Sequence, residues 1–381
     1  MIQKLFLFLV ALHWAHHPAL AGAPTTADGF ALPLPDAHFA FPRDHGSHPE
    51  YKIEWWYVTG HLFATNTGVE PKRFGFQATF FRRATPRTQA STAATPNFGD
   101  QHLFLAHLAL LDVSTGKFLH QERLNREGWD AQSDTHTLAV RNGDWSLRII
   151  DPITTQMELQ GTINTAAKFQ LRLVPTKPLV IFGTRGVSQK AAEIWASSHY
   201  LTFPRLATTG TVQLGPQSFS VTGEAWMDHE ISSSQLGAGQ AGWDWACLQL
   251  DDGREIMTYR MRRTDGTTDP FSTVAWVDSV GSVRQCGPDG FRLEALSRWR
   301  SPRSKANYPS RVRLVTADPQ NGRERAFILE PLATDQELSG ALGGMPYWEG
   351  ACRVLNEEGK TIGQAFLEMT GYAGSWRGTL E

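Results

Sequence analysis

The chain has few of the residues that disulfide scaffolds and thiolate metal sites require. Its 381 residues include three cysteines, Cys247, Cys286 and Cys352, which are too few for a disulfide-dense framework. Their spacings contain no CxxC knuckle, which argues against a thiolate zinc site. At least one thiol is left out of any internal pair, and composition does not settle the state of the three.

An excess of charge of one sign is also missing. Thirty-six Lys and Arg residues face 38 Asp and Glu residues, which gives a formal net charge of −2. This balance provides no general electrostatic attraction for nucleic acid or anionic lipid. We therefore expect no nucleic-acid partner.

Several catalytic motifs are absent as well. The sequence has no GxSxG elbow of a serine hydrolase, no HExxH pair, no GxGxxG motif in a βαβ context and no GxxxxGK[ST] phosphate loop. These absences argue against serine-triad hydrolysis, nicotinamide chemistry and phosphoryl transfer. No cofactor is expected.

The N-terminus has the pattern of an export signal. Lys4 precedes the apolar run 5–12, and Ala19-Leu20-Ala21 supplies small residues where a signal peptidase cleaves. We predict that residues 1–21 are a signal peptide and that the protein is exported, to the periplasm or the medium. No later stretch approaches the roughly 20 apolar residues of a membrane-spanning helix, so the mature chain is expected to lack one.

The body of the chain is rich in the two-residue alternation of half-buried strands. Phe74, Phe76, Ala78 and Phe80 alternate with smaller or polar residues. Short strands separated by Gly, Pro, Asn and Asp predict a β-barrel or β-sandwich. Further strands are predicted at residues 170–174, 219–226, 245–250, 255–261, 311–315, 326–329 and 362–369.

Three other segments are distinctive. Residues 189–197 are expected to form one short accessory helix, because their apolar residues can share one side. Residues 85–99, rich in Thr, Ala and Pro, are expected to form a loop between strands. The Ser- and Gly-rich residues 231–242 are the best composition break and give an approximate domain boundary.

Two clusters combine aromatic residues with acids and histidines. The first reads FPRDHGSH at 41–48 and EWWYVTG at 54–60. The second reads GEAWMDHE at 223–230, followed by WDW at 243–245. If the second cluster is extended, Trp226, Asp228 and Glu230 share one face and His229 lies on the other.

Both clusters resemble signatures of the AttH-like proteins, relatives of the carotenoid 1,2-hydratases that are often labelled secreted hydrolases. The likeness covers most of the mature chain. It implies an all-β fold of two tandem lipocalin-like barrel or sandwich domains with few short helices, at residues 41–230 and 243–381. It also implies a hydrophobic ligand, isoprenoid or polyene-like, and association with an envelope transport system.

Acid-initiated hydration or isomerisation of a C=C bond is the activity that the resemblance implies. The resemblance assigns the role of the essential acid of the hydratases to Asp228. Burial and a neighbouring carboxylate would raise the pKa of this acid. Glu230, which stands where the hydratase pattern favours Asn, or His229 would accept a proton from water. The ligand-binding candidates are Trp55, Trp56, Tyr57, Trp226, Trp243 and Trp245. Among them, the π face of Trp226, Trp243 or Trp245 would stabilise the carbocation.

The first cluster has supporting roles in this hypothesis. Asp44, His45 and His48 are interpreted as a hydrogen-bonded corner. Glu54, flanked by Ile53 and Trp55, is expected to need a buried partner such as Arg or His, in a structural or a catalytic role. A zinc site formed by His45 and His48 with Asp44 or Glu50 is the alternative, and we predict no metal.

Two other functions stay open beside the enzyme. One is a non-enzymatic lipid-binding or transporter-accessory protein of the envelope. The less favoured one is a metal-dependent hydrolase. His107, within the apolar run 103–111, is interpreted as a residue of the core.

Overall fold

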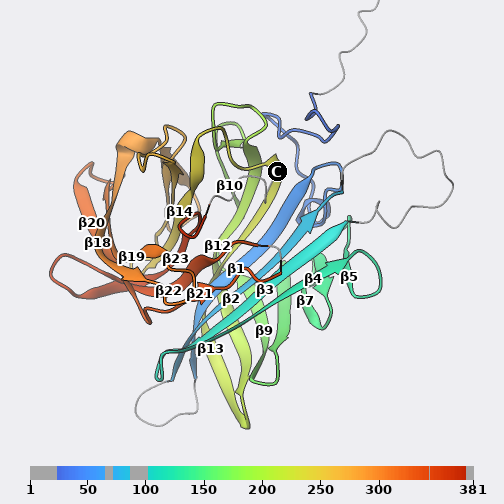
Figure 1. Ribbon diagram of the computed structural model, residues 1–381, viewed down its shortest axis with the longest axis horizontal. Coiled ribbons are helices and arrows are strands. Elements are labelled where there is room, and N and C mark those ends of the chain that lie inside the picture. Colours follow the sequence, from blue (N-terminus) through green and yellow to red (C-terminus); the bar gives the residue numbers. More distant parts are fainter. Residues whose placement is uncertain (1–23, 65–71, 86–101, 343, 375–381) are drawn as a thin grey trace, which may run out of the picture.

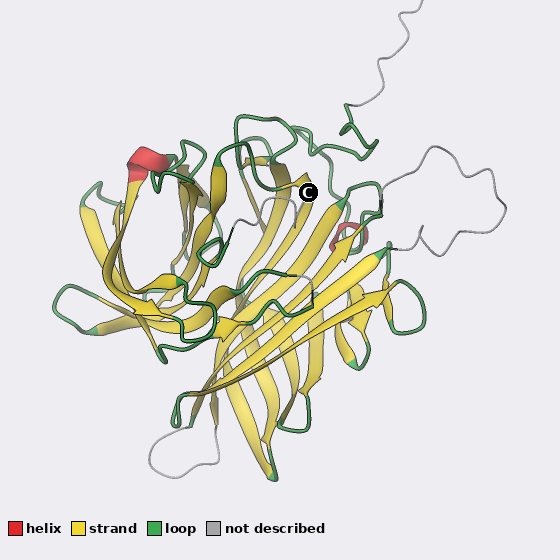
Figure 2. Ribbon diagram, in the orientation of Figure 1, coloured by secondary structure: helices red, strands yellow, loops and turns green. Residues whose placement is uncertain are grey.

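The computed structural model describes residues 24–64, 72–85, 102–342 and 344–374. Regular structure in these residues is almost entirely β-strand, and the helical residues form two 3-10 turns, η1 at Arg43–His45 and η3 at Pro288–Gly290 (Figure 2). No helix in this part of the chain is long and apolar enough to cross a membrane. The predicted signal peptide and most of the 85–99 loop lie outside the described residues.

The first sheet takes up the first half of the chain and is antiparallel. β10 (Val180–Phe182) and β11 (Ser188–Gln189) pair with β12 (Ser197–Leu214) beside the main path. The main strand order is β4 (Lys117–Arg126), β3 (Leu103–Asp112), β2 (Arg73–Arg83), β1 (Ile53–Ala64), β13 (Gln217–Ser234), β12 (Ser197–Leu214), β9 (Ala167–Pro175), β8 (Gln156–Ile163), β7 (Trp145–Asp151), β6 (Ala139–Asn142) and β5 (Ala131–Ser133).

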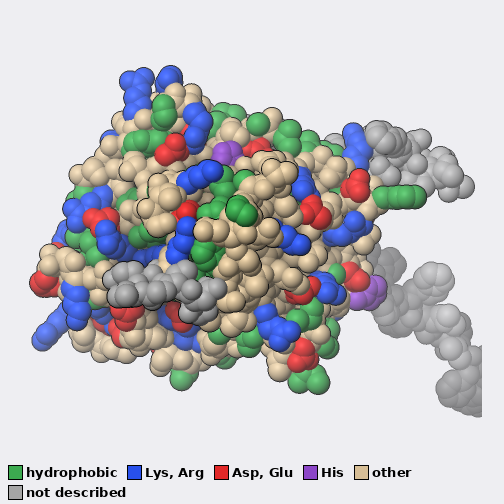
Figure 3. All heavy atoms as spheres, turned by 90° about the horizontal axis from the view of Figure 1, so that it is seen from below, with side chains coloured by type: hydrophobic (Ala, Val, Ile, Leu, Met, Phe, Trp, Pro, Cys, Tyr) green, Lys and Arg blue, Asp and Glu red, His purple; other side chains and the backbone are tan. Residues whose placement is uncertain are grey.

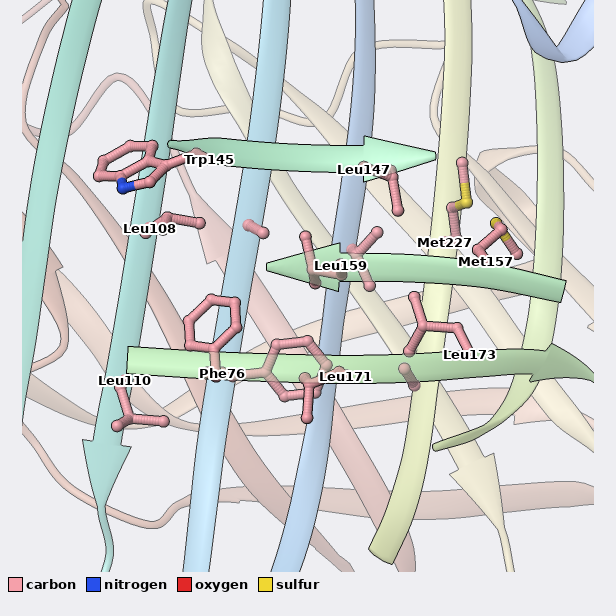
Figure 4. Packing of buried hydrophobic residues seen from close by; sticks show 14 of the residues in the cluster. Phe76, Leu108, Leu110, Trp145, Leu147, Met157, Leu159, Leu171, Leu173 and Met227 are labelled. Carbon is pink, nitrogen blue, oxygen red and sulfur yellow. The ribbon is translucent and has the colours of Figure 1, made fainter. Parts of the chain in front are cut away.

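This sheet curls back on itself, and apolar side chains fill the space inside. β7, β8 and β9 cross in front of β1, β2, β3 and β13, with side chains pointing into the gap from both layers (Figure 4). Trp145 and Leu159 from one layer and Phe76, Leu108 and Met227 from the other are almost completely buried. The interior of the first unit is therefore a packed core.

The second sheet begins at β14 (Gln240–Leu250) and is also antiparallel. β21 (Glu337–Leu338) pairs with β22 (Tyr347–Leu355) at its side. The main order is β17 (Val283–Cys286), β16 (Thr273–Val277), β15 (Glu255–Arg263), β14 (Gln240–Leu250), β23 (Thr361–Met369), β22 (Tyr347–Leu355), β20 (Glu324–Pro331), β19 (Asn307–Ala317) and β18 (Phe291–Arg300). It curls around a core of its own that includes Trp276, Phe327 and Leu367.

The expected all-β class with two tandem lipocalin-like units is confirmed. Every strand predicted from two-residue alternation falls inside a strand of the structure. The predicted helix at 189–197 is wrong, because residues 190–196 form turns between β11 and β12. The Gln189 side chain donates to the carbonyls of Ala191 and Glu193. Ala191 is buried, but Ile194 and Trp195 are exposed, so the apolar side expected for a helix is not formed.

The two units pack face to face through the outer surfaces of their sheets. The second sheet, yellow to red in Figure 1, lies beside the long strands β1, β2 and β13. A third group of buried apolar side chains, including Leu111, Trp245, Tyr347 and Phe366, occupies this interface. A Cβ at Gly75 would lie 2.5 Å from Cβ of Ala351, so glycine at 75 allows the close approach.

Charges of both signs are mixed on the surface. On the face seen from below, Lys and Arg side chains lie interspersed with Asp and Glu side chains (Figure 3). This face therefore has no large area of one sign, in agreement with the formal net charge of −2.

Candidate functional site

The candidate site is a cavity of about 70 Å³ between the two sheets. It lies outside both cores, at the interface of the units. The first sheet and its loops contribute Trp55, Tyr57, Thr79, Phe81, Lys190, Tyr200, Asp228, Glu230 and Gln235, and the second contributes Trp243, Trp245, Tyr259, Met261, Tyr347, Glu349 and Glu368.

Strand β13 places two of the predicted site residues in the wall of this cavity. Asp228 and Glu230 line it, and Trp226 lies beside them and donates from Nε1 to Oδ1 of Asp228 at 2.7 Å. His229 points to the opposite face of the sheet, where it stacks on Trp56. This is the division expected for an extended 226–230 segment, and it separates His229 from the cavity.

Asp228 is a buried carboxyl group held by three donors. In addition to Trp226, Thr202 donates to Oδ1 at 2.6 Å and Tyr200 donates to Oδ2 at 2.7 Å. Burial raises the pKa of Asp228 to about 7, with added repulsion from Glu230, and these effects outweigh the hydrogen bonds that favour the charged form. Near neutral pH the group can therefore hold or release a proton.

Glu230 has a different environment two residues further on. Lys190 Nζ lies 3.2 Å from Oε2 of Glu230, and Ser198 donates to the same oxygen. The Glu230 carboxylate is thus paired with a cation, whereas Asp228 is held only by neutral donors. Sequence reasoning did not find Lys190, because the surrounding segment was expected to form a helix.

The second sheet adds two acids that sequence reasoning also missed. Glu349 on β22 and Glu368 on β23 are directly paired across the strands. Burial and the neighbouring carboxyl group raise the pKa of Glu349 well above its ordinary value, and burial raises that of Glu368 to about 7. The signal in the sequence that could have identified them is a single Glu among the apolar residues of a strand, as in YWEGA and FLEMT.

Most of the predicted aromatic residues border the cavity. Trp55, Tyr57, Trp243 and Trp245 line it, and the Tyr57 and Trp245 rings make an edge-on contact at 5.3 Å. Trp56 does not line it, because alternation along β1 turns its side chain into the first core. The Trp56 indole instead donates to the carbonyl of His45 at 3.1 Å.

A row of polar residues crosses the first sheet at the level of Asp228, and the second unit makes hydrogen bonds along it. Tyr57 donates to Glu349 at 2.5 Å, and the Glu122 carboxylate accepts from the Gly340 amide at 2.7 Å. His107, whose pKa burial lowers to about 4, lies 2.8 Å from the Tyr347 hydroxyl. The row follows the strand register through Thr202, Asp228, Tyr57, Thr79, His107 and Glu122.

The first sequence cluster forms a separate network on the far face of β1. Glu54 is fully buried and accepts from Arg82 Nε at 3.0 Å, which supplies the expected buried partner. His48 contacts Glu54 through Nδ1 at 2.9 Å and Asp44 through Nε2 at 3.0 Å, and His229 Nε2 contacts Glu54 at 2.9 Å. Arg82 and its partners hold the pKa of Glu54 well below its ordinary value despite burial.

This network is the one group of described side chains with the composition of a metal site. Ligand atoms of His48, Glu54 and His229 lie within 4.8 Å of one another. Their distances are those of hydrogen bonds, and the Arg82 guanidinium on Glu54 would repel a cation. His45 is not part of this group, and its ring lies tilted against Phe41 with the centroids 4.4 Å apart, so the described residues do not assemble the zinc site considered from His45 and His48.

The three thiols are all free. Cys247 and Cys352 are buried and Cys286 is exposed. Burial raises the pKa of Cys247 and of Cys352, so neither is a reactive thiolate.

Two curled β-sheets in tandem, with an acidic and aromatic cavity between them, define a tandem lipocalin-like protein. The class can be narrowed by comparison with known families. The chain belongs to the AttH-like family, whose model matches residues 32–372. None of the curated proteins gave a match to the chain.

Solved structures share this architecture over almost the whole chain. A Nitrosomonas europaea protein assigned as an AttH is 32% identical, with a TM-score of 0.78 over 90% of this chain and 100% of the other. Kievitone hydratase from Nectria haematococca is 13% identical, with a TM-score of 0.64 over 92% and 97%. CghA in complex with Sch210972 is 11% identical, with a TM-score of 0.51 over 92% and 98%. The last two likenesses concern the fold alone.

Proposed function

We propose that the protein binds an apolar, unsaturated small molecule between its two sheets and transfers a proton from Asp228 to a C=C bond. The observation that carries the proposal is a buried carboxyl group with a pKa of about 7 in an aromatic-lined cavity. A general acid works best when its pKa lies near the operating pH. Hydration is the first reaction to test, since one protein of the same fold is named a hydratase.

The residues of the cavity suit the two halves of such a reaction. The Asp228 proton would bond to one alkene carbon, and the positive charge on the other carbon would lie among the π faces of Trp55, Trp243 and Trp245. Water would add to that carbon and give its extra proton to Glu230, on the same face of β13. Proton exchange between the two carboxyl groups would then restore Asp228. If a neighbouring C–H proton is lost instead of water being added, the product is an isomer.

The size of the cavity limits how the ligand enters. About 70 Å³ is far below the roughly 300–1,000 Å³ of pockets that enclose a drug-sized molecule. An isoprenoid or polyene would therefore insert one end, with the rest of its chain leaving between the sheets. The reacting double bond should be near that end.

The proposal is tested by incubating the protein with a panel of polyenes and isoprenoid alkenes in H₂¹⁸O and D₂O. Mass analysis detects added water through ¹⁸O and isomerisation through carbon-bound deuterium. Asp228→Asn should abolish either signal. The matched control is Asp112→Asn, which removes a buried, Lys72-paired carboxylate outside the cavity. Equal turnover by wild type and Asp228→Asn would exclude this acid.

A second candidate function is ligand carriage without chemistry. It is favoured by the three hydrogen bonds on Asp228, which hold that carboxyl in the wall. In this alternative the protein carries a lipid in the cell envelope or assists a transport system. Native mass spectrometry of gently purified protein would then find an unchanged copurifying lipid.

Export forms part of both candidate functions. It rests on the N-terminal residues 1–21. Expression of the full chain with a C-terminal tag, followed by cell fractionation and N-terminal sequencing, tests it. The expected mature N-terminus is Gly22, and an uncleaved cytoplasmic protein would refute export.

A further inference from the structure

Lys190 is a buried lysine in the wall of the cavity. Its side chain is 6% exposed. The Lys190 amide donates to the carbonyl of Ala196, and the Gln240 side chain donates to the Lys190 carbonyl, so the backbone is fixed on both sides. Nζ lies 4.7 Å from the ring centroid of Tyr200 and 4.1 Å from that of Tyr259. The ammonium group is therefore held at one place beside the ligand space.

Comparison with Lys177 shows what is unusual about Lys190. The Lys177 side chain is also 6% exposed, but its Nζ donates to three oxygens, those of Gly253, Glu255 and Asp278, at 2.5–2.8 Å. Within the described part of the chain, Lys190 Nζ has one oxygen partner, Glu230, at 3.2 Å. An ammonium group has three N–H donors, and a buried one normally satisfies them. Lys177 is satisfied by the protein alone, whereas Lys190 is not.

The ion pair with Glu230 uses one of the three ammonium donors of Lys190. Glu230 has a second, uncharged partner in Ser198, which donates to the same oxygen. Burial opposes the charge of Lys190, yet Glu230 and the nearby Tyr259 and Asp228 keep its pKa above the ordinary value. The cavity thus presents a fixed cation with spare donors, surrounded by aromatic faces.

We propose that Lys190 binds an acidic oxygen of the ligand, so that the preferred ligands are unsaturated apolar molecules carrying a carboxylate or enolate group. This inference rests on the proposed ligand site but not on its catalytic activity. The oxyanion would take up the ammonium donors that no protein oxygen uses. Its charge would also orient the molecule, with the acidic group at Lys190 and the apolar chain along the tryptophans.

Two fluorescent probes with the same polyene chain test the proposal, namely cis-parinaric acid and its methyl ester. Titration of the full-length protein gives the ratio of the two dissociation constants, ester over acid. The wild type should prefer the acid, and Lys190→Met should reduce the ratio by about tenfold or more, which is typical of losing a hydrogen bond to a charged group. Lys177→Met is the matched control, since it removes an equally buried lysine that does not line the cavity.

Glu230→Gln should change the ratio of the two dissociation constants in the opposite direction. It retains Lys190 but removes the competing carboxylate, so the preference for the acid should increase. A variant that only perturbs folding would weaken acid and ester alike. The proposal is overturned if wild type binds neither probe or has no preference, if Lys190→Met retains the wild-type ratio, or if Glu230→Gln lowers it. Absence of turnover with an intact acid preference would instead refute the proposed reaction alone.

Discussion

The Tyr57 hydroxyl donates to Oε1 of Glu349 at 2.5 Å, linking β1 of the first sheet to β22 of the second. Oε2 of Glu349 has no partner within the described residues, although the side chain is almost fully buried. An acid of the second unit is thus held in the cavity wall by a residue of the first. The site exists only when the two units are packed together.

Tyr57→Phe should lower the free energy of unfolding by about 1 kcal/mol, the usual cost of losing such a hydrogen bond. It should also raise the pKa of Glu349 further, because the lost bond favours the charged form. Urea unfolding at pH 5 measures the stability change. Tyr51→Phe is the control, since no described partner hydrogen-bonds the Tyr51 hydroxyl. Equal losses in the two variants would contradict a specific role for the Tyr57–Glu349 bond.

Glu368→Gln should stabilise the protein at neutral and alkaline pH. Burial raises the pKa of Glu368 from 4.5 to about 7, so the native state binds more protons than the unfolded state between these values. Stability therefore falls as pH rises through this window, and the loss for this group reaches about 3 kcal/mol above pH 7. The amide carries no such penalty. Unfolding curves from pH 4 to pH 8 should be flatter for Glu368→Gln, whereas Glu358→Gln, at an exposed turn residue, should follow wild type.

Local alternation made part of the site predictable from the sequence. A two-residue period assigns Asp228 and Glu230 to one face of β13 and His229 to the other, whatever the strand packs against. The same rule separates Trp55, which lines the cavity, from Trp56, which packs into the first core, so the predicted ligand-binding role is wrong for Trp56.

The remaining site residues depend on contacts that are distant in sequence. Glu349 and Glu368 reach the cavity because one particular face of the second sheet packs against the first. No local pattern specifies which face that is. Lys190 is placed by hydrogen bonds to Ala196 and Gln240, and the apolar periodicity of residues 189–197 therefore predicted the wrong structure.

His48→Gln should destabilise the protein more at pH 6 than at pH 8.5. Burial opposes the charge of His48, but Glu54 and Asp44 outweigh it and raise the pKa above 6.5. The stabilisation from the protonated ring is fully present below pH 6.5 and is lost as pH rises through the raised value. Thermal unfolding at the two pH values measures the difference. His136→Gln, which removes an exposed histidine, should show no such dependence, and a pH-independent loss in His48→Gln would contradict the charged network.

Asp228 and His229 are chain neighbours whose substitution should have opposite consequences. In Asp228→Asn the amide oxygen can still accept from Thr202 and Trp226, and the amide nitrogen can face Tyr200. Stability should therefore be maintained, and above pH 7, where an ionised Asp228 is costly, it should rise. Proton transfer to the ligand should be lost.

His229→Leu removes a partner of the buried Glu54 and should cost roughly 1–3 kcal/mol of stability. Because its side chain faces away from the cavity, turnover per folded molecule should be unchanged. Turnover and urea unfolding of both variants, measured together, separate the two roles. Loss of turnover in a fully folded His229→Leu protein would mean that the chemistry extends through the sheet to Glu54, and the assignment of the reaction to the cavity face would then be wrong.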